Sequence, residues 1–149
     1  MSRQQLYALV SLATAVGIAG YYLLAINGLS GGAGLTGQAA RLFIRVILIA
    51  TLVQFILDIA QSIGALSVDK DERDRSIDGR GYRNGYYVLI VVVFTAIGHL
   101  AVSALAGQHF DEQFLASMPL ITLHILVLGS MAAVATHAAT RLYFYNKGI

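Results

Sequence analysis

The chain has 149 residues, of which 57% are hydrophobic and only 12% charged, with a formal net charge of +2. This composition is too apolar for a soluble domain and predicts an all-α membrane protein whose solvent is lipid. The absence of cysteine excludes disulfides, thiolate metal sites and cysteine nucleophiles, and the small net charge gives no reason to expect a nucleic acid as a partner.

Four apolar runs each approach the roughly 20 residues that a helix needs to cross about 30 Å of hydrocarbon. They predict transmembrane helices at residues 6–26, 42–66, 86–106 and 118–143 of a single transmembrane domain that covers residues 1–149. The runs pair into two hairpins of similar layout, so the expected fold is a four-helix bundle, with an internal pseudo-repeat as an open possibility.

Lysine and arginine are unevenly distributed over the segments that flank these runs. Eight of the ten lie at the amino end, in the central loop at 67–85 or at the carboxyl end, whereas the opposite side carries only Arg41 and Arg45. Because basic residues in short loops stay on the cytoplasmic side, this count predicts that both termini and the central loop are cytoplasmic.

The glycines of the first loop and the charges of the central loop each suggest a motif. Residues 32–37 match the GxGxxG pattern, but no β-strand precedes them, so a flexible turn is expected rather than a nucleotide site. In the central loop, Asp69 and Glu72 form a capping box, which predicts a helix over 69–78 that acts as a connector. The five acids and five bases of the whole central loop cancel. Gly79, Gly81 and Gly85 are expected to break or bend the helix.

Small residues mark the positions where membrane helices can approach closely. The first helix offers Ala13, Gly17 and Gly20, and the fourth helix is rich in alanine and glycine from Gly129 to Ala139. These residues predict that the first and fourth helices lie inside the bundle.

Ionisable residues inside the predicted spans are the strongest candidates for function, because a charge in hydrocarbon costs several kcal/mol. Asp58 and His137 each lie nine residues from the expected cytoplasmic end of their helix, so we predict that they meet inside the bundle as a polar pair. The pair serves either as interhelical glue or in proton or ion movement, and the sequence leaves both alternatives open.

His99 and His124 could instead contact a cofactor. Both lie about eight residues from the outer loop, so a single haem b between them is an alternative, whereas His124 and His137 are about 140° apart on one helix and cannot stack two haems along one face. The principal expectation is that no cofactor and no metal is bound.

The central loop contains DERDRSI at 71–77 and GYRNGYYVL at 81–89, and the carboxyl end reads TRLYFYNKG at 140–148. These segments resemble those of a family of small uncharacterised bacterial four-helix membrane proteins, although Asn146 stands where that family usually has a second basic residue. The resemblance implies a multi-pass protein of the bacterial inner (cytoplasmic) membrane and carries no active site with it.

No Ser-His-Asp, paired-carboxylate or HExxH arrangement appears at a usable spacing, so an enzyme is not expected. The sequence favours an interaction or accessory component of the membrane, whose partners are the lipid bilayer and other membrane proteins or a second copy of the chain. The alternatives are a proton- or ion-coupled carrier that uses Asp58 and His137, and a mono-haem electron carrier that uses His99 and His124.

Overall fold

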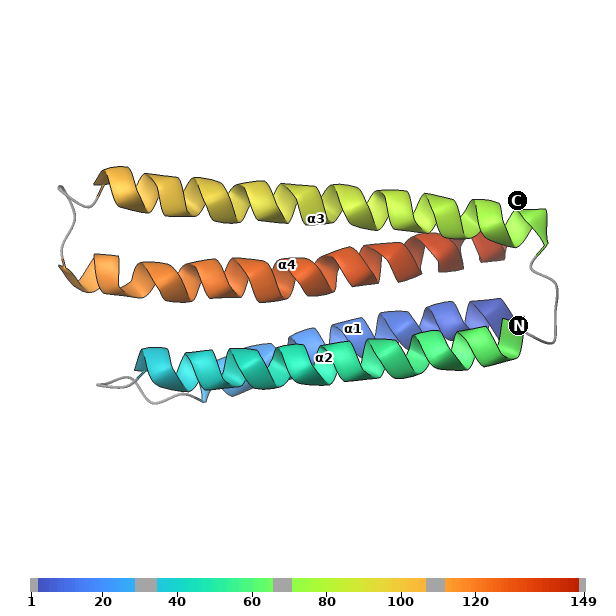
Figure 1. Cartoon of the computed structure of the whole chain (residues 1–149), viewed down its shortest axis with the longest axis horizontal. Coiled ribbons are helices and arrows are strands. Elements are labelled where there is room, and N and C mark those ends of the chain that lie inside the picture. The colour runs from blue at the N-terminus through green and yellow to red at the C-terminus, as the bar shows by residue number, and fades with distance from the viewer. Residues whose placement is uncertain (1–2, 29–34, 66–70, 107–111, 148–149) are drawn as a thin grey trace.

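The computed structural model describes residues 3–28, 35–65, 71–106 and 112–147, and the regular elements within these ranges are all helices. They are α1 (Arg3–Asn27), α2 (Leu35–Ala65), α3 (Glu72–Ala106) and α4 (Glu112–Lys147), drawn in Figure 1. Each of the four is long and apolar enough to cross a membrane. The predicted all-helical fold with four helices is therefore confirmed.

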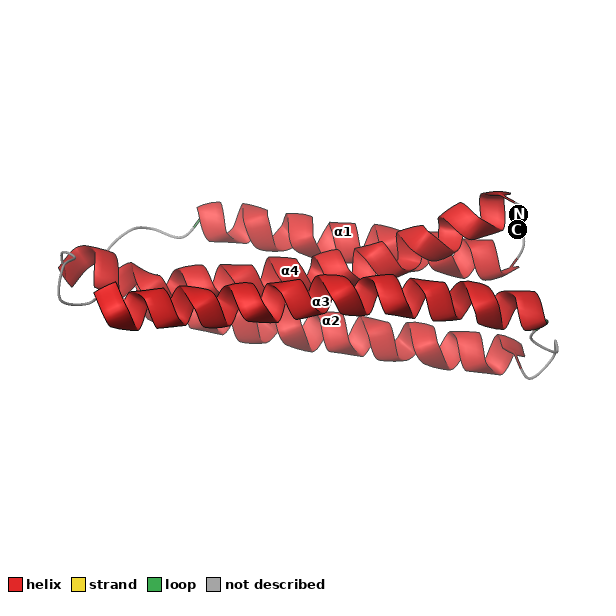
Figure 2. Cartoon of the chain, turned by 90° about the horizontal axis from the view of Figure 1, so that it is seen from above, coloured by secondary structure: helices red, strands yellow, loops and turns green. Residues whose placement is uncertain are grey.

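Consecutive helices run in opposite directions, so the two ends of the described chain lie at the same end of the bundle (Figures 1 and 2). There Gln5 donates a hydrogen bond to Asn146 across 3.3 Å. The end of α2 and the start of α3 lie at this end too. We call it the charged end, because α3 begins there with the acidic and basic residues of the segment 71–83.

The helices do not pack evenly around the bundle. The most extensive seam joins α3 to α4, and α4 also packs on α1, which in turn holds α2. Helix α2 touches α4 only lightly, and no seam joins α2 to α3 within the described residues. The bundle therefore consists of two hairpins that meet through α1 and α4, with one side left open between α2 and α3.

Helix α3 is continuous from the charged segment to its far end, which contradicts the expected break at the glycines. The helix predicted over 69–78 is present from Glu72 onward, whereas Asp69 lies outside the described residues. A Cβ added at Gly81 would lie 2.7 Å from His137 Cδ2, and one at Gly85 would lie 3.0 Å from the Ala133 carbonyl oxygen. These two glycines therefore bring α3 close to α4 rather than ending the helix.

The seam between α1 and the rest of the bundle uses small residues, but not the predicted ones. Ala8, Ser11 and Ala15 are buried, at a spacing that keeps them on one helix face, whereas Ala13 and Gly17 are exposed. Helices α1 and α4 share a seam, but its α1 face is not the one that Ala13 and Gly17 predicted.

Helices α2 and α4 begin before the predicted spans. Helix α2 begins at Leu35, so the end of the glycine segment, Leu35 to Gly37, is helical and the rest of it lies outside the described residues. Helix α4 begins at Glu112 and includes Pro119, which the sequence placed just inside the fourth span. The outer connections are correspondingly shorter than predicted.

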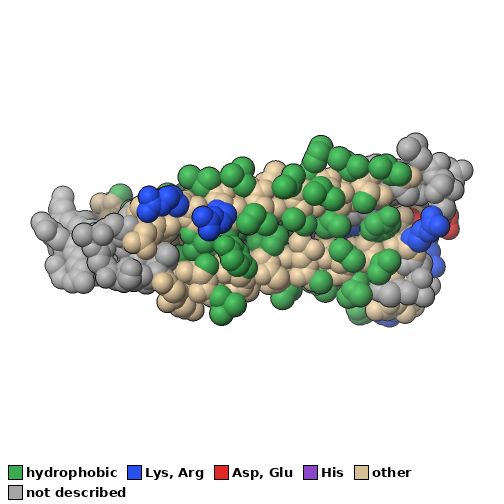
Figure 3. All heavy atoms as spheres, turned by 90° about the horizontal axis from the view of Figure 1, so that it is seen from below, with side chains coloured by type: hydrophobic (Ala, Val, Ile, Leu, Met, Phe, Trp, Pro, Cys, Tyr) green, Lys and Arg blue, Asp and Glu red, His purple; other side chains and the backbone are tan. Residues whose placement is uncertain are grey.

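Large apolar side chains lie mostly on the outside of the bundle. The buried cluster consists of only Tyr22, Leu42, Val46 and Val127, while Leu105 is 81% exposed and Phe94 is 67% exposed. Figure 3 shows hydrophobic side chains along the whole middle of one face, with basic side chains toward its two ends. This surface suits a helix bundle surrounded by lipid.

Candidate functional site

The open side between α2 and α3 forms a groove of about 410 Å³ that contains both Asp58 and His137. We call it the lateral groove. Helix α2 contributes Gln54 and Asp58, α3 contributes Tyr82, Gly85, Tyr86 and Leu89, and α4 contributes Ala133, Val134 and His137. The two residues that the sequence singled out thus face the same space from different helices.

His137 is held firmly at the bottom of this groove by α3. Its ring stacks on Tyr82 with the ring centroids 4.3 Å apart and the planes inclined by 27°. Gly81 and Gly85 leave just enough room for the imidazole between the two helices. Its Nε2 atom is buried and has no hydrogen-bond partner among the described residues, so this nitrogen can still accept or donate one bond.

Asp58 lies on the opposite wall and is exposed in the isolated chain. Its carboxylate accepts a hydrogen bond from Gln54 Nε2, one helical turn earlier, at 3.1 Å. Asp58 and His137 are near enough to interact electrostatically, but no hydrogen bond between them is observed in this described part of the chain. The two residues thus line the same groove, and the direct pairing that the sequence suggested stays a prediction.

A buried ion pair next to His137 fixes the height of α3 relative to α4. Arg141 Nε lies 2.8 Å from Asp78 Oδ1, and the side chains of these residues are only 4% and 17% exposed. The Arg141 guanidinium also donates to Gln4 Oε1 of α1 at 3.4 Å, and Asn84 donates to Thr140 one turn further along the seam at 3.2 Å. Sequence reasoning assigned Arg141 only to the topology count and missed this interaction, although a charge one turn after His137 was visible.

This pairing changes the expected depth of the groove. Residues 78–83 of α3, which include Asp78, Arg80 and Arg83, lie beside residues 137–144 of α4. Because charged side chains avoid hydrocarbon, a bilayer around this bundle would end near His137, about 9 Å short of the predicted end at residue 143. Asp58 and His137 would then lie within about one helical turn of the membrane border.

His99 and His124 lie toward the other end of the bundle and face different neighbours. His99 of α3 shares a 2.9 Å hydrogen bond with Thr122, whereas His124 shares one of 2.6 Å with Tyr22 of α1. Thr122 and His124 are two positions apart on α4 and so point about 200° apart around the helix. His99 and His124 are therefore directed to opposite sides of α4, which is not the arrangement that one haem between them requires.

No group of three or more metal-ligating side chains occurs in the described ranges. The class that these observations define is a bundle of four helices, each long and apolar enough to cross a membrane, with a mostly apolar groove on one side that contains a carboxylate and an imidazole. Comparison of the chain with protein families, curated proteins and solved structures finds no match.

Proposed function

We propose that the chain is a multi-pass protein of the bacterial inner membrane, with both termini in the cytoplasm, that binds another membrane protein through the lateral groove. The observation that carries the proposal is the groove itself, because α2 and α3 leave a space between them that the exposed carboxylate of Asp58 and the ring of His137 both line. This function needs no catalytic group and no cofactor.

The chemistry of the groove indicates what the partner must offer. Gln54 donates one hydrogen bond to the Asp58 carboxylate, and a carboxylate that faces lipid near the membrane border is stabilised further by a second donor or a cation. A transmembrane helix with a polar or basic side chain at this depth would pair with Asp58, while small residues would let it approach Leu89 and Val134. We therefore propose that a transmembrane helix of a different membrane protein occupies the lateral groove.

The distribution of basic residues supports the proposed orientation of the bundle in the membrane. Eight of the ten lysines and arginines belong to the amino end, the segment 67–85 and the carboxyl end, and these parts of the chain meet at the charged end of the bundle. By the positive-inside rule, that end is cytoplasmic.

A proton- or ion-coupled carrier is the second candidate, favoured by the presence of a carboxylate and an imidazole in one groove. A carrier also needs polar groups that continue toward the other side of the membrane. His124 lies thirteen residues from His137, which is about 20 Å along α4 and on another face, and its ring already contacts Tyr22. His137 and His124 therefore do not form a continuous path among the described residues, and the interaction function is preferred.

The proposal can be tested with single cysteines, since the chain has none of its own. Leu89→Cys lies in the groove, and Val91→Cys is a matched control on α3 that is 65% exposed and outside the groove. With a photoreactive maleimide in native membranes, Leu89→Cys should give one defined adduct with a second protein and Val91→Cys should not. Asp58→Leu, which makes the groove apolar, should abolish that adduct.

Three results would contradict the proposal. Equal adducts from both cysteines would show general lipid exposure, and an adduct of twice the mass of the chain would assign the groove to a second copy. Proton flux in liposomes that wild-type protein supports and Asp58→Asn lacks, while the variant stays folded, would establish the carrier instead.

A further inference from the structure

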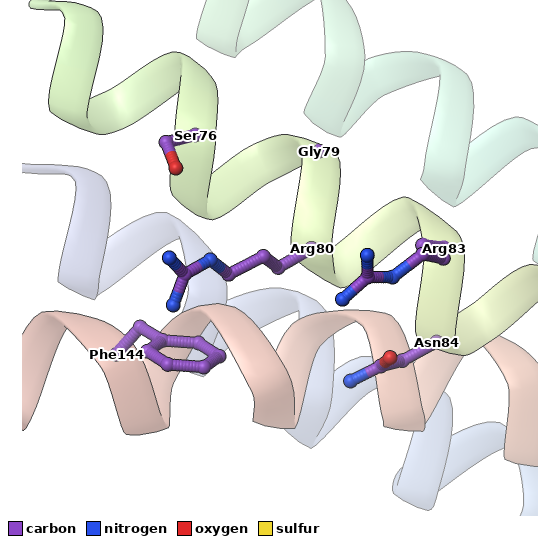
Figure 4. A pocket seen from close by; sticks show the side chains of 6 residues that line it. All are labelled: Ser76, Gly79, Arg80, Arg83, Asn84 and Phe144. Atoms are coloured by element: carbon purple, nitrogen blue, oxygen red, sulfur yellow. The ribbon is translucent and has the colours of Figure 1, made fainter.

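A second cavity, of about 450 Å³, lies at the charged end on the other flank of the seam between α3 and α4. It is lined by Ser76, Gly79, Arg80, Arg83 and Asn84 of α3 and by Phe144 of α4, and we call it the arginine pocket. Figure 4 shows that both arginine side chains extend from α3 toward α4. Two guanidinium groups therefore border one polar cavity.

Neither arginine is neutralised by a carboxylate of the described residues. The Arg80 guanidinium lies over the Phe144 ring at 4.7 Å from its centroid, a contact that fixes its plane and leaves its N–H edges available. The nearest acid in sequence, Asp78, is paired with Arg141. The segment is neutral as a whole, as the sequence indicated, but its structure separates the acids from a locally basic pocket.

The position of the pocket favours a lipid over a free anion. A bilayer that ends near His137 would bring Arg80 and Arg83 to the level of the headgroups, because Gly81 of the same turn packs against His137. About one, two and three turns beyond Arg83, the same flank of α3 carries Tyr87, Val91 and Phe94, whose side chains are 59%, 65% and 67% exposed. An acyl chain attached to a headgroup in the pocket would lie along these residues.

We propose that the arginine pocket binds the phosphodiester of an acidic phospholipid. The two guanidinium groups donate charge-assisted hydrogen bonds to the phosphate oxygens, and the Ser76 hydroxyl is a further donor that lines the pocket. The exposed apolar flank of α3 receives the chains. This site is separate from the lateral groove, which lies on the opposite flank of the α3 helix, so each proposal can fail without the other.

The test uses the full chain purified in a mild detergent and measured by native mass spectrometry and thermal unfolding. Dioleoylphosphatidylglycerol should remain bound and raise the unfolding temperature, whereas dioleoylphosphatidylcholine should do neither at the same concentration. Arg80→Gln combined with Arg83→Gln should weaken the binding of phosphatidylglycerol by roughly five-fold per arginine, the effect typical of a basic side chain at an anionic membrane surface. Arg75→Gln, on an exposed position of α3 outside the pocket, is the matched control and should bind as wild type.

The charge-preserving variant Arg80→Lys with Arg83→Lys should retain most of the binding, which separates loss of charge from loss of folding. Phosphatidylglycerol binding that survives in the double glutamine variant would overturn the site. If inorganic phosphate stabilised the protein as much as phosphatidylglycerol does, the pocket would bind a free anion rather than a lipid headgroup, and the proposal would be overturned. Equal weakening by Arg75→Gln would mean that only general surface charge is involved, and would also overturn the proposal.

Discussion

Two glycines of α3 that are two residues apart should respond differently to the same substitution, with a gain in stability at Gly79 that is absent or reversed at Gly81. At Gly81 a Cβ would lie 2.7 Å from His137 Cδ2, 3.0 Å from Arg141 Cγ and 3.1 Å from the His137 carbonyl oxygen. The carbonyl belongs to the α4 backbone and cannot turn away as a side chain can, so Gly81→Ala must push the two helices apart. At Gly79 no atom lies within 4 Å of the added Cβ.

The magnitudes follow from this difference in space. Replacing glycine by alanine within a helix stabilises it by about 1 kcal/mol, and this gain applies at both positions. Overpacking a close contact costs about 1–3 kcal/mol and applies only at Gly81. Gly79→Ala should therefore raise the free energy of unfolding by about 1 kcal/mol. The free energy of unfolding of Gly81→Ala should be about 1–3 kcal/mol lower than that of Gly79→Ala.

The free energies can be measured by titrating the purified protein from mild detergent into SDS and following helix content by circular dichroism. Gly98→Ala, another position with open space, provides a second control that should behave like Gly79→Ala. If Gly81→Ala were as stable as Gly79→Ala, the helices would not be in close contact there, and the position of His137 beside α3 would be wrong.

Three further predictions concern the ion pair, the far end of the bundle and the topology. Arg141→Met should lower the free energy of unfolding by about 3 kcal/mol, because it leaves the buried Asp78 carboxylate without its guanidinium. The double variant that also carries Asp78→Leu should regain most of this stability, and equal losses in the single and double variants would contradict the pairing. Tyr22→Phe should cost about 0.6 kcal/mol in the same titration, since it removes one interhelical hydrogen bond, and no change would indicate that the bond to α4 does not form. A cytoplasmic reporter fused after the last residue should be active and one inserted at Gln108 inactive, and activity at Gln108 would refute the orientation.

The number of helices and their membrane-spanning length could be predicted because both depend on composition within a window of about 20 residues. The same information determined the direction of each helix relative to its neighbours, and so the approximate level of Asp58 and His137. It could not determine the height of α3 against α4. That offset depends on the contact of Gly81 with His137 and on the Asp78–Arg141 pair, which join residues 56 to 63 positions apart in the sequence.

Glycine was the residue type most often misjudged, for a physical reason. In a sequence, a cluster such as Gly79, Gly81 and Gly85 indicates a break, because glycine weakens an isolated helix. Between packed helices the missing Cβ permits a close approach, and the dispersion attraction between the two helices along the seam offsets the lower propensity. Gly17 shows the converse, since it lies in open space on an exposed face of α1 although it was expected at a seam.

The lateral groove itself follows from the uneven distribution of small residues. Helix α4 carries alanine, glycine or serine at most positions from Gly129 to Ala139 and packs on all three other helices, whereas the middle of α2 is built from large side chains such as Leu48, Leu52 and Phe55. These large side chains keep α2 from approaching its neighbours closely, and in lipid no hydrophobic driving force brings the helices together. At the charged end α2 is instead held by the hydrogen bond from the Tyr7 hydroxyl to the Ala60 carbonyl oxygen, at 3.3 Å. Asp58 thus lies on the helix that the bundle secures least, and a partner that pairs with this carboxylate would supply the contact that α2 lacks on its α3 side.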